Sequence, residues 1–193
     1  MATITLLTGN QRKKDSLSRI FESMRLKGVG LVIENPWLPE IQADTTAEIA
    51  AFAARYGADM LNKPVIKMDS GFFVEALGGF PGPFVRTTAE KIGQVRFFTL
   101  LDDIENKRAW LTNSLSYCEP GSNPVTFNAQ CEGEVVATYV PINLSFIDEL
   151  FIPHHPINLE NKTMGQLRLD DPTCILDIWG DAEYQFSQWY QNR

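Results

Sequence analysis

The beginning of the chain constrains its fold more than any other segment. An apolar run from Ile4 to Leu7 leads into Thr8-Gly9-Asn10, and a cationic segment with Lys13 follows. This pattern predicts a strand, a tight turn and the start of a helix, which is typical of α/β proteins. Backbone N–H groups, a hydroxyl, an amide and an ammonium would converge there on a polyphosphate. The alternative is an ordinary surface turn whose cations serve solubility.

Further apolar patterns predict an α/β fold with a mixed sheet. Strands and helices alternate early, and a long antiparallel pair follows with its turn at 120–123. The segment 77–84 is too rich in Gly and Pro for regular structure. The expected helices are Ser16 to Leu26, Thr45 to Leu61, Thr87 to Leu101 and Asp181 to Tyr190; the expected strands are Thr3 to Leu7, Val29 to Ile33, Pro64 to Met68, Ala109 to Cys118 and Val125 to Tyr139.

Composition narrows the class of protein. The 193 residues are 44% hydrophobic and show no linker or repeat, so we expect one domain over residues 1–193. A net charge of -7 argues against duplex nucleic acid as a partner. Cys118, Cys131 and Cys174 are widely spaced, which predicts reduced thiols rather than a disulfide framework or zinc site. No apolar run reaches the length of a membrane span, so we expect a soluble, cytoplasmic protein with no membrane partner.

Carboxylates supply the second set of candidate site residues. Asp69 stands where an apolar strand meets Ser70-Gly71, and that position predicts a side chain at the carboxyl edge of the sheet. Such a carboxylate can ligate Mg²⁺ or deprotonate an attacking water. The alternative is that Asp69 caps the following turn. Glu40, after Leu38-Pro39, has the same two readings.

Four ordered motifs give the chain a family resemblance. They are T-G-N-x-x-K after the first strand, the segments 38–42 (LPEIQ) and 69–71 (DSG), and the segment 76–83 (ALGGFPGP). Across roughly residues 3 to 90 this order resembles the inosine triphosphate pyrophosphatase family. The segment from Ile147 to Pro153 is similar to a later loop of that family. These enzymes hydrolyse non-standard purine nucleoside triphosphates to the monophosphate and pyrophosphate.

The resemblance implies a fold, a cofactor and a set of site residues. The fold would be an elongated mixed β-sheet flanked by helices, with a central cleft between two lobes, usually in a homodimer that requires Mg²⁺. Asp69 would be the general base and would ligate the metal with Glu40, and Lys13 would assist catalysis. The substrate, a nucleoside triphosphate, would be held by Thr8, Gly9, Asn10, Lys13, Ser70, Asp148, Lys162 and Arg168.

The chain also departs from the family pattern. Met68 stands where an acidic residue is common, Ser16 replaces a Glu of the first helix, and Ala53 replaces a Lys of the second. Gln166-Leu167 stands where the family has Ser-His before an Arg, residues that help to read the base. Triphosphate chemistry is therefore better preserved than base recognition.

The sequence leads to a Mg²⁺-dependent nucleoside-triphosphate diphosphatase with an altered base pocket. Two other readings stay open. The lost charges at 16, 53 and 68 would also suit a nucleotide-binding homologue without catalysis, and the 78–84 and Trp37 loops would also suit a protein interface.

Overall fold

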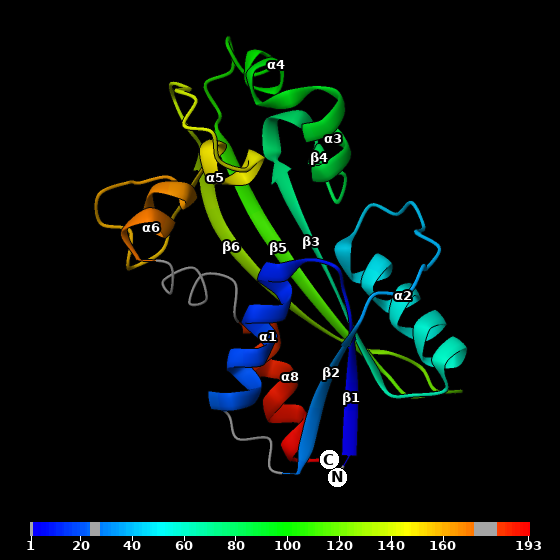
Figure 1. The fold of residues 1–193 in the computed structure, drawn as a ribbon. Coiled ribbons are helices and arrows are strands. Elements are labelled where there is room, and N and C mark those ends of the chain that lie inside the picture. The colour runs from blue at the N-terminus through cyan, green and yellow to red at the C-terminus, as the bar shows by residue number, and fades with distance from the viewer. Residues whose placement is uncertain (1, 24–27, 172–180) are drawn as a thin grey trace. The chain divides into compact units, whose positions relative to one another are not determined.

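The computed structural model describes residues 2–23, 28–171 and 181–193 and has the mixed α/β fold that the sequence predicts (Figure 1). The strands are β1 (Ala2–Leu7), β2 (Val29–Glu34), β3 (Val65–Val74), β4 (Pro81–Gly82), β5 (Arg108–Cys118), β6 (Val125–Val135) and β7 (Phe151–Pro153). The helices are α1 (Gln11–Ser23), α2 (Thr46–Leu61), α3 (Val85–Lys91), α4 (Gly93–Thr99), α5 (Phe146–Leu150), α6 (Met164–Asp170) and α8 (Asp181–Gln191), with a 3-10 turn, η1, at Glu75–Leu77.

The described strands form one mixed sheet in the order β2-β1-β3-β5-β6-β7, and β4 pairs with β3. β1 lies parallel to both β2 and β3, whereas β3–β4 and β6–β7 are antiparallel. β5 and β6 are neighbours joined by the short segment 119–124. A connection this short suits only antiparallel strands, because a parallel pair needs a long crossover.

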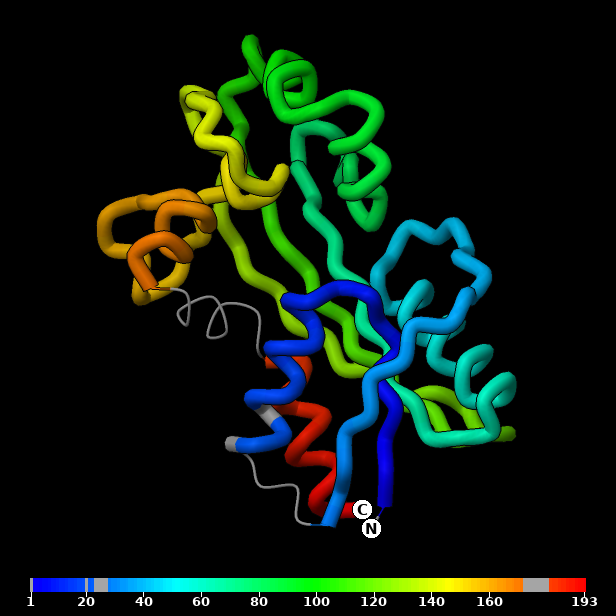
Figure 2. Tube along the Cα trace, in the orientation of Figure 1, coloured from blue at the N-terminus to red at the C-terminus, as the bar shows by residue number. Residues whose placement is uncertain are grey.

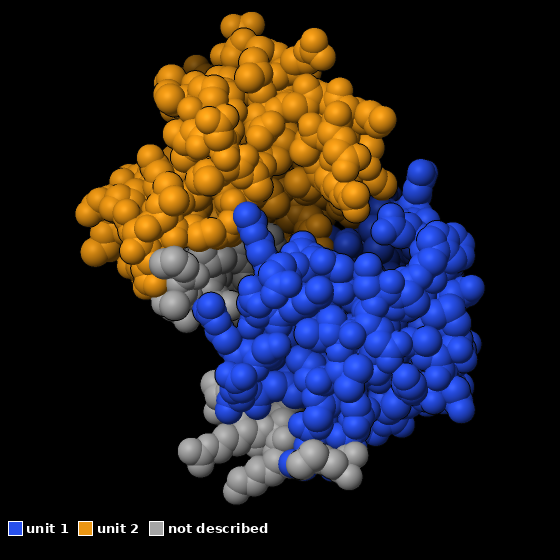
Figure 3. All heavy atoms as spheres, in the orientation of Figure 1, with its two compact units in different colours: residues 1–69, 113–129, 180–193 blue, residues 70–112, 130–179 orange. Residues whose placement is uncertain are grey.

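The chain divides into two compact units, which Figure 3 colours separately. Unit 1 comprises residues 1–69, 113–129 and 180–193, and unit 2 comprises residues 70–112 and 130–179. The expectation of a single domain stays a prediction. Each unit has its own buried cluster of apolar side chains, and each is described below by itself.

Unit 1 has helices on both faces of its strands. Ile4, Leu6, Ile66 and Met68 pack with Leu17 of α1 and Phe186 of α8. Leu7 and Val65, which alternate with them along β1 and β3, pack instead with Ala54 and Ala58 of α2. Figure 2 traces α1 beside α8, and the rings of Phe21 and Phe186 stack with centroids 6.3 Å apart. Strand alternation therefore assigns each β3 side chain of unit 1 to the α1–α8 face or to the α2 face.

Unit 2 has an aromatic core. The ring of Phe72 on β3 contacts Phe97 of α4, Phe146 of α5 and Phe151 of β7 with centroids 5.7 to 6.5 Å apart. These contacts are tilted or edge-on, as the charge distribution of aromatic rings favours. They join helices α4 and α5 to the sheet residues of this unit.

The structure corrects four expected element bounds. β3 continues through 69–71, where we expected a turn, and ends only at Val74. Residues 85–99 form two helices, because Gly93 adopts a left-handed φ of 77° that interrupts a helix. α1 begins at Gln11 rather than Ser16, because the side chain of Asn10 caps it, and β6 ends at Val135 rather than Tyr139. Thr45 caps α2 as expected.

Two further expectations concern cysteines and membranes. Cys118 and Cys131 are free, buried thiols, as predicted, and Cys174 lies outside the described residues. Burial raises the pKa of the Cys131 thiol to about 11. Among the helices of the described ranges, none combines the length and apolar character that crossing a bilayer requires.

Candidate functional site

The turn predicted to bind phosphate is built by its own side chains. Thr8, which is buried, accepts a hydrogen bond from the Asn10 amide at 3.0 Å, and Asn10 Oδ1 accepts from the Arg12 amide at 2.9 Å. A Cβ at Gly9 would lie 2.9 Å from Asn35 Nδ2, so the absence of a side chain lets Asn35 approach. These bonds fix the start of α1, whose N-terminal dipole favours an anion.

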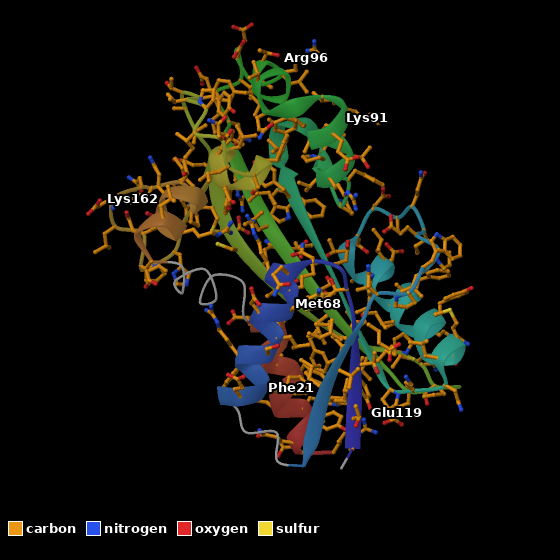
Figure 4. All side chains as sticks on the ribbon, in the orientation of Figure 1. Phe21, Met68, Lys91, Arg96, Glu119 and Lys162 are labelled. Atoms are coloured by element: carbon orange, nitrogen blue, oxygen red, sulfur yellow. The ribbon has the colours of Figure 1, made fainter. Side chains whose placement is uncertain are left out.

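Lys13 reaches from α1 to the backbone of β3. Its Nζ donates to the carbonyl oxygen of Met68 at 2.8 Å (Met68 is labelled in Figure 4). Burial lowers the pKa of Lys13, the charge of Asp69 raises it, and Lys67 lowers it again. The charges of the ammonium predicted to contact phosphate and of the carboxylate predicted to be the general base therefore act on each other.

Asp69 lies inside β3 and not at the end of a strand. The strand continues past Gly71, so the reading of Asp69 as the cap of a following turn is wrong. Asp69 shares the parity of Val65 and Lys67 along the strand, which assigns it to the α2 face. Asp69 follows Met68 in the chain, so it is the next residue after the backbone carbonyl group that Lys13 contacts.

Lys67 is a site residue that the sequence reasoning missed. Burial lowers the pKa of Lys67, and the charges of Asp69 and Glu40 both raise it. The two carboxylates predicted to ligate a metal therefore act on one ammonium. Strand alternation could have identified Lys67, because it stands two residues before Asp69.

We use the name charge cluster for the unit 1 residues Lys13, Glu40, Lys67 and Asp69. Its two carboxylates offer the oxygen ligands that Mg²⁺ prefers. Among the described residues, no three Asp, Glu, His or Cys side chains gather closely enough to enclose a metal by themselves. A site with two carboxylates fits Mg²⁺, which commonly completes its coordination with water and substrate phosphates.

A second missed residue, Glu183 of α8, is 1% exposed. Ser16 Oγ donates to its Oε1 and Asn113 Nδ2 to its Oε2, both at 3.0 Å. Burial raises the pKa of Glu183, while hydrogen bonds from its own amide, Ser16 and Asn113, and the charge of Lys13, act in the other direction. Residue spacing could not reveal this contact, because Ser16 and Glu183 are 167 positions apart.

Three of the predicted substrate-binding residues in unit 2 are Ser70, Asp148 and Arg168. Ser70 follows Asp69 in β3. Asp148 is 2% exposed on α5, and its Oδ2 accepts from Ser145 Oγ at 2.7 Å and from the Arg168 guanidinium. Asp148 and Arg168, which the resemblance assigned to substrate binding, thus form an ion pair with each other.

The remaining predicted residues near α6 are bound to neighbours in the same segment. Lys162 Nζ forms ion pairs with Glu160 at 2.7 Å and Asp170 at 2.8 Å, and Figure 4 labels it at the outside of unit 2. Gln166 Oε1 accepts from the Thr163 amide at 2.8 Å and closes a capping box. Leu167 is buried in the unit 2 core. Of the two side chains that stand in place of Ser-His, Gln166 is therefore hydrogen-bonded at the start of α6 and Leu167 is packed in the core.

Comparisons with known proteins show the family of this chain. A family model described as the Ham1 family matches residues 4–176. A protein of Methanopyrus kandleri named dITP/XTP pyrophosphatase is 35% identical over 98% of this chain and 96% of its own length. A Trypanosoma cruzi protein named inosine triphosphate pyrophosphatase 2 is 33% identical over 69% of this chain and 66% of its own length.

The fold has relatives among solved structures as well. A HAM1 protein from Coxiella burnetii superposes over 100% of both chains with a TM-score of 0.83 and 23% identity. A Staphylococcus aureus Ham1 protein gives a TM-score of 0.79 over 98% of both chains at 22% identity. At this identity the structural likeness shows the fold alone. With the family model matching most of its length, the chain belongs to the Ham1 family.

Proposed function

We propose that this protein is a Mg²⁺-dependent nucleoside-triphosphate pyrophosphohydrolase, which converts a nucleoside triphosphate to the monophosphate and pyrophosphate. The observation that carries the proposal is the charge cluster: within unit 1 of a Ham1 family chain, the charge of Asp69 acts on both Lys13 and Lys67, and the charge of Glu40 acts on Lys67. The printed names of its relatives, dITP/XTP and inosine triphosphate pyrophosphatases, support the same reaction.

The proposed chemistry is attack of water on the α-phosphorus. Asp69 accepts a proton from the water as the new oxygen–phosphorus bond forms, and the bond from the α-phosphorus to the pyrophosphate oxygen breaks. Lys13 and Lys67 stabilise the negative charge that grows on the phosphate oxygens, with Thr8, Gly9 and Asn10 holding the polyphosphate at the start of α1. Ser70 contacts the substrate beside Asp69.

Glu40 and Asp69 would hold the Mg²⁺ ion. When bound, the ion supplies positive charge to the phosphate oxygens of the substrate. The ammonium groups of Lys13 and Lys67 supply the same kind of charge from the protein, so the cluster matches a strongly anionic ligand.

Asp69→Asn tests the reaction directly. We expect turnover to fall by about 100-fold or more, the range for loss of a general base, with the melting temperature little changed. Pyrophosphate release is measured over normal, deaminated, oxidised and pyrimidine triphosphates with and without Mg²⁺. Asp103→Asn, which removes an exposed carboxylate of unit 2, is the matched control. Nucleotide binding without turnover in the unmodified protein would instead favour a non-catalytic homologue.

We also propose that base recognition differs from that of the family pattern. Gln166 closes the capping box of α6 and Leu167 packs in the unit 2 core, so neither side chain offers the polar groups of Ser-His to a base. Asp148, Arg168 and Lys162 are the remaining candidates for contact with the nucleoside. A homodimer and a cytoplasmic location stay predictions, the first of which sedimentation at micromolar concentration would test.

A further inference from the structure

Unit 1 buries a carboxylate, Glu183, that the proposed reaction does not use and whose charge acts on Lys13. Glu183 of α8 receives hydrogen bonds from Ser16 of α1 and Asn113 of β5, and the three side chains are 1%, 9% and 3% exposed. Burying a charge is costly unless it is paired and hydrogen-bonded. Here each carboxylate oxygen has a donor from a different element, so the group links α1, β5 and α8.

The carboxylate lies on the side of α1 that carries Lys13. Residues 13 and 16 are three positions apart, so their side chains are neighbours on the helix surface. From there the Lys13 ammonium reaches the carbonyl oxygen of Met68. The charged groups that act on this ammonium are Asp69 and Lys67 of β3 and Glu183 of α8.

The negative charge of Glu183 is what a neutral side chain of the same shape would lack. A glutamine of the same shape could accept from Asn113 and exchange a hydrogen bond with Ser16. Such an amide would avoid the cost of burying a negative charge, a cost visible in the raised pKa of Glu183. Of these two side chains at position 183, only the carboxylate adds a negative charge that acts on Lys13.

We propose that Glu183 is a positioning residue for Lys13: it fixes the helix that carries the lysine and keeps the ammonium charged where it meets the β3 backbone. Its link to catalysis rests on the proposed function, in which Lys13 binds phosphate. A carboxylate at position 16 of α1 would lie close to the same place, because Ser16 and Glu183 are in direct contact.

Glu183→Gln is the first test. We expect kcat/KM for triphosphate hydrolysis to fall about tenfold, because Lys13 loses one of the negative charges that act on it. The melting temperature at neutral pH should stay the same or rise, because a buried charge is removed. Ser187→Ala, at a fully buried position one turn further along α8, is the control and should change kcat/KM less than twofold. A lower melting temperature with kcat/KM within twofold of the unmodified protein would overturn the inference.

A transposed pair gives the second test. Glu183→Ser combined with Ser16→Glu moves the carboxylate from α8 to α1 across one hydrogen bond. We expect the double variant to recover most of the activity that Glu183→Ser loses. Ser16→Glu alone places two carboxylates together and should destabilise the fold. A folded double variant with no recovery would show that a carboxylate at this place is not what Lys13 needs.

A readout without substrate separates this inference from the proposed function. Reductive methylation at fixed pH labels only the neutral amine, so Glu183→Gln should make Lys13 react several-fold faster, as followed by mass spectrometry. Lys63, which pairs with Glu34, is the internal control. Faster Lys13 labelling in a protein that hydrolyses no triphosphate would support the role of Glu183 and reject the function. An unchanged Lys13 rate would reject the role of Glu183 whatever the activity.

Discussion

At the scale of single residues, opposite charges in unit 1 are arranged around two lysines. Lys13 and Lys67 are both desolvated, which disfavours their charged forms and lowers the pKa of each, while nearby carboxylates act in the opposite direction. Asp69 acts on both ammonium groups. A polyphosphate entering this cluster would find positive charge already in place, which reduces the reorganisation that its reaction requires.

Lys67→Met tests the second lysine. The methionine keeps an apolar stem of similar length and removes the charge, so we expect kcat/KM to fall by about 10- to 100-fold, the effect of losing one preorganised cation. The fall should appear mainly in KM if Lys67 binds the ground state and in kcat if it acts on the transition state. Lys63→Met removes an equal charge four residues earlier, where the lysine pairs with Glu34. Equal effects of the two variants would remove Lys67 from the site.

At the scale of elements, short local motifs fix the segments that carry candidate residues. Asn10 caps α1, Thr163 and Gln166 close the capping box of α6, and Glu149 organises the chain before α5. The Glu149 carboxylate accepts from the amides of Ile142 and Leu144 at 3.1 and 2.8 Å and from the Tyr139 hydroxyl. These hydrogen bonds hold residues 139–144, the segment before α5, against the helix that carries Asp148.

Glu149 and Glu183 should respond to pH in opposite ways. Burial opposes ionisation of Glu149, but the Tyr139 and backbone bonds outweigh it and hold its pKa below the ordinary 4.5. Its contribution is therefore present above that value and is lost as the pH falls through the lower pKa of the folded state. The pKa of Glu183 is raised, so its contribution is present at low pH and is lost as the pH rises above 4.5 through the folded-state value.

Melting curves between about pH 3 and pH 7 measure both slopes. Glu149→Gln should be less stable than the unmodified protein at neutral pH, by about 1–3 kcal/mol, and the gap should narrow in acid. Glu183→Gln should gain stability relative to the unmodified protein as the pH rises. Parallel curves for the two variants would contradict the assignment of the two carboxylates.

At the scale of the whole molecule, an acidic chain has two interacting lysines in unit 1. The net charge is -7, yet Lys13 and Lys67 lie together in unit 1. The chemistry proposed for the triphosphate uses unit 1 residues and Ser70, whereas the residues assigned to the nucleoside lie in unit 2.

The preference among bases should accordingly be weak. A site that hydrogen-bonds the distinctive groups of its substrate rejects analogues by about 10⁴-fold or more, whereas a site without those bonds discriminates by only about 10- to 200-fold. We expect the ratio of kcat/KM for inosine over adenosine triphosphate to stay below about 100, since Gln166 and Leu167 are committed to α6 and its core. A ratio above about 10⁴ would show that other residues read the base.

Much of this molecule follows from local sequence. The strand–turn–helix at Thr8-Gly9-Asn10, the capped helix at Thr45 and the alternation along β1 depend on residues close in the chain, and each was predictable from spacing. The ordered motifs likewise supplied Lys13, Glu40 and Asp69 as candidate site residues, a prediction that awaits the tests above. Errors arose where tertiary packing overrode a local signal: a Gly-containing segment at 69–71 continues as strand because β3 is paired within the sheet.

The sequence alone thus determined the fold class, the family and the main candidates for phosphate chemistry, since short-range patterns encode all three. Only the tertiary structure decided that Lys13 donates a hydrogen bond to the Met68 carbonyl oxygen. It also decided that the charges of Asp69 and Glu40 act on Lys67. Finally, it decided that Ser16 donates a hydrogen bond to Glu183. The physical reason is that burial and Coulomb energy depend on distance in space. The partners of Ser16 and Asn113 come from α8, 167 and 70 positions away in the chain, where no periodicity connects them.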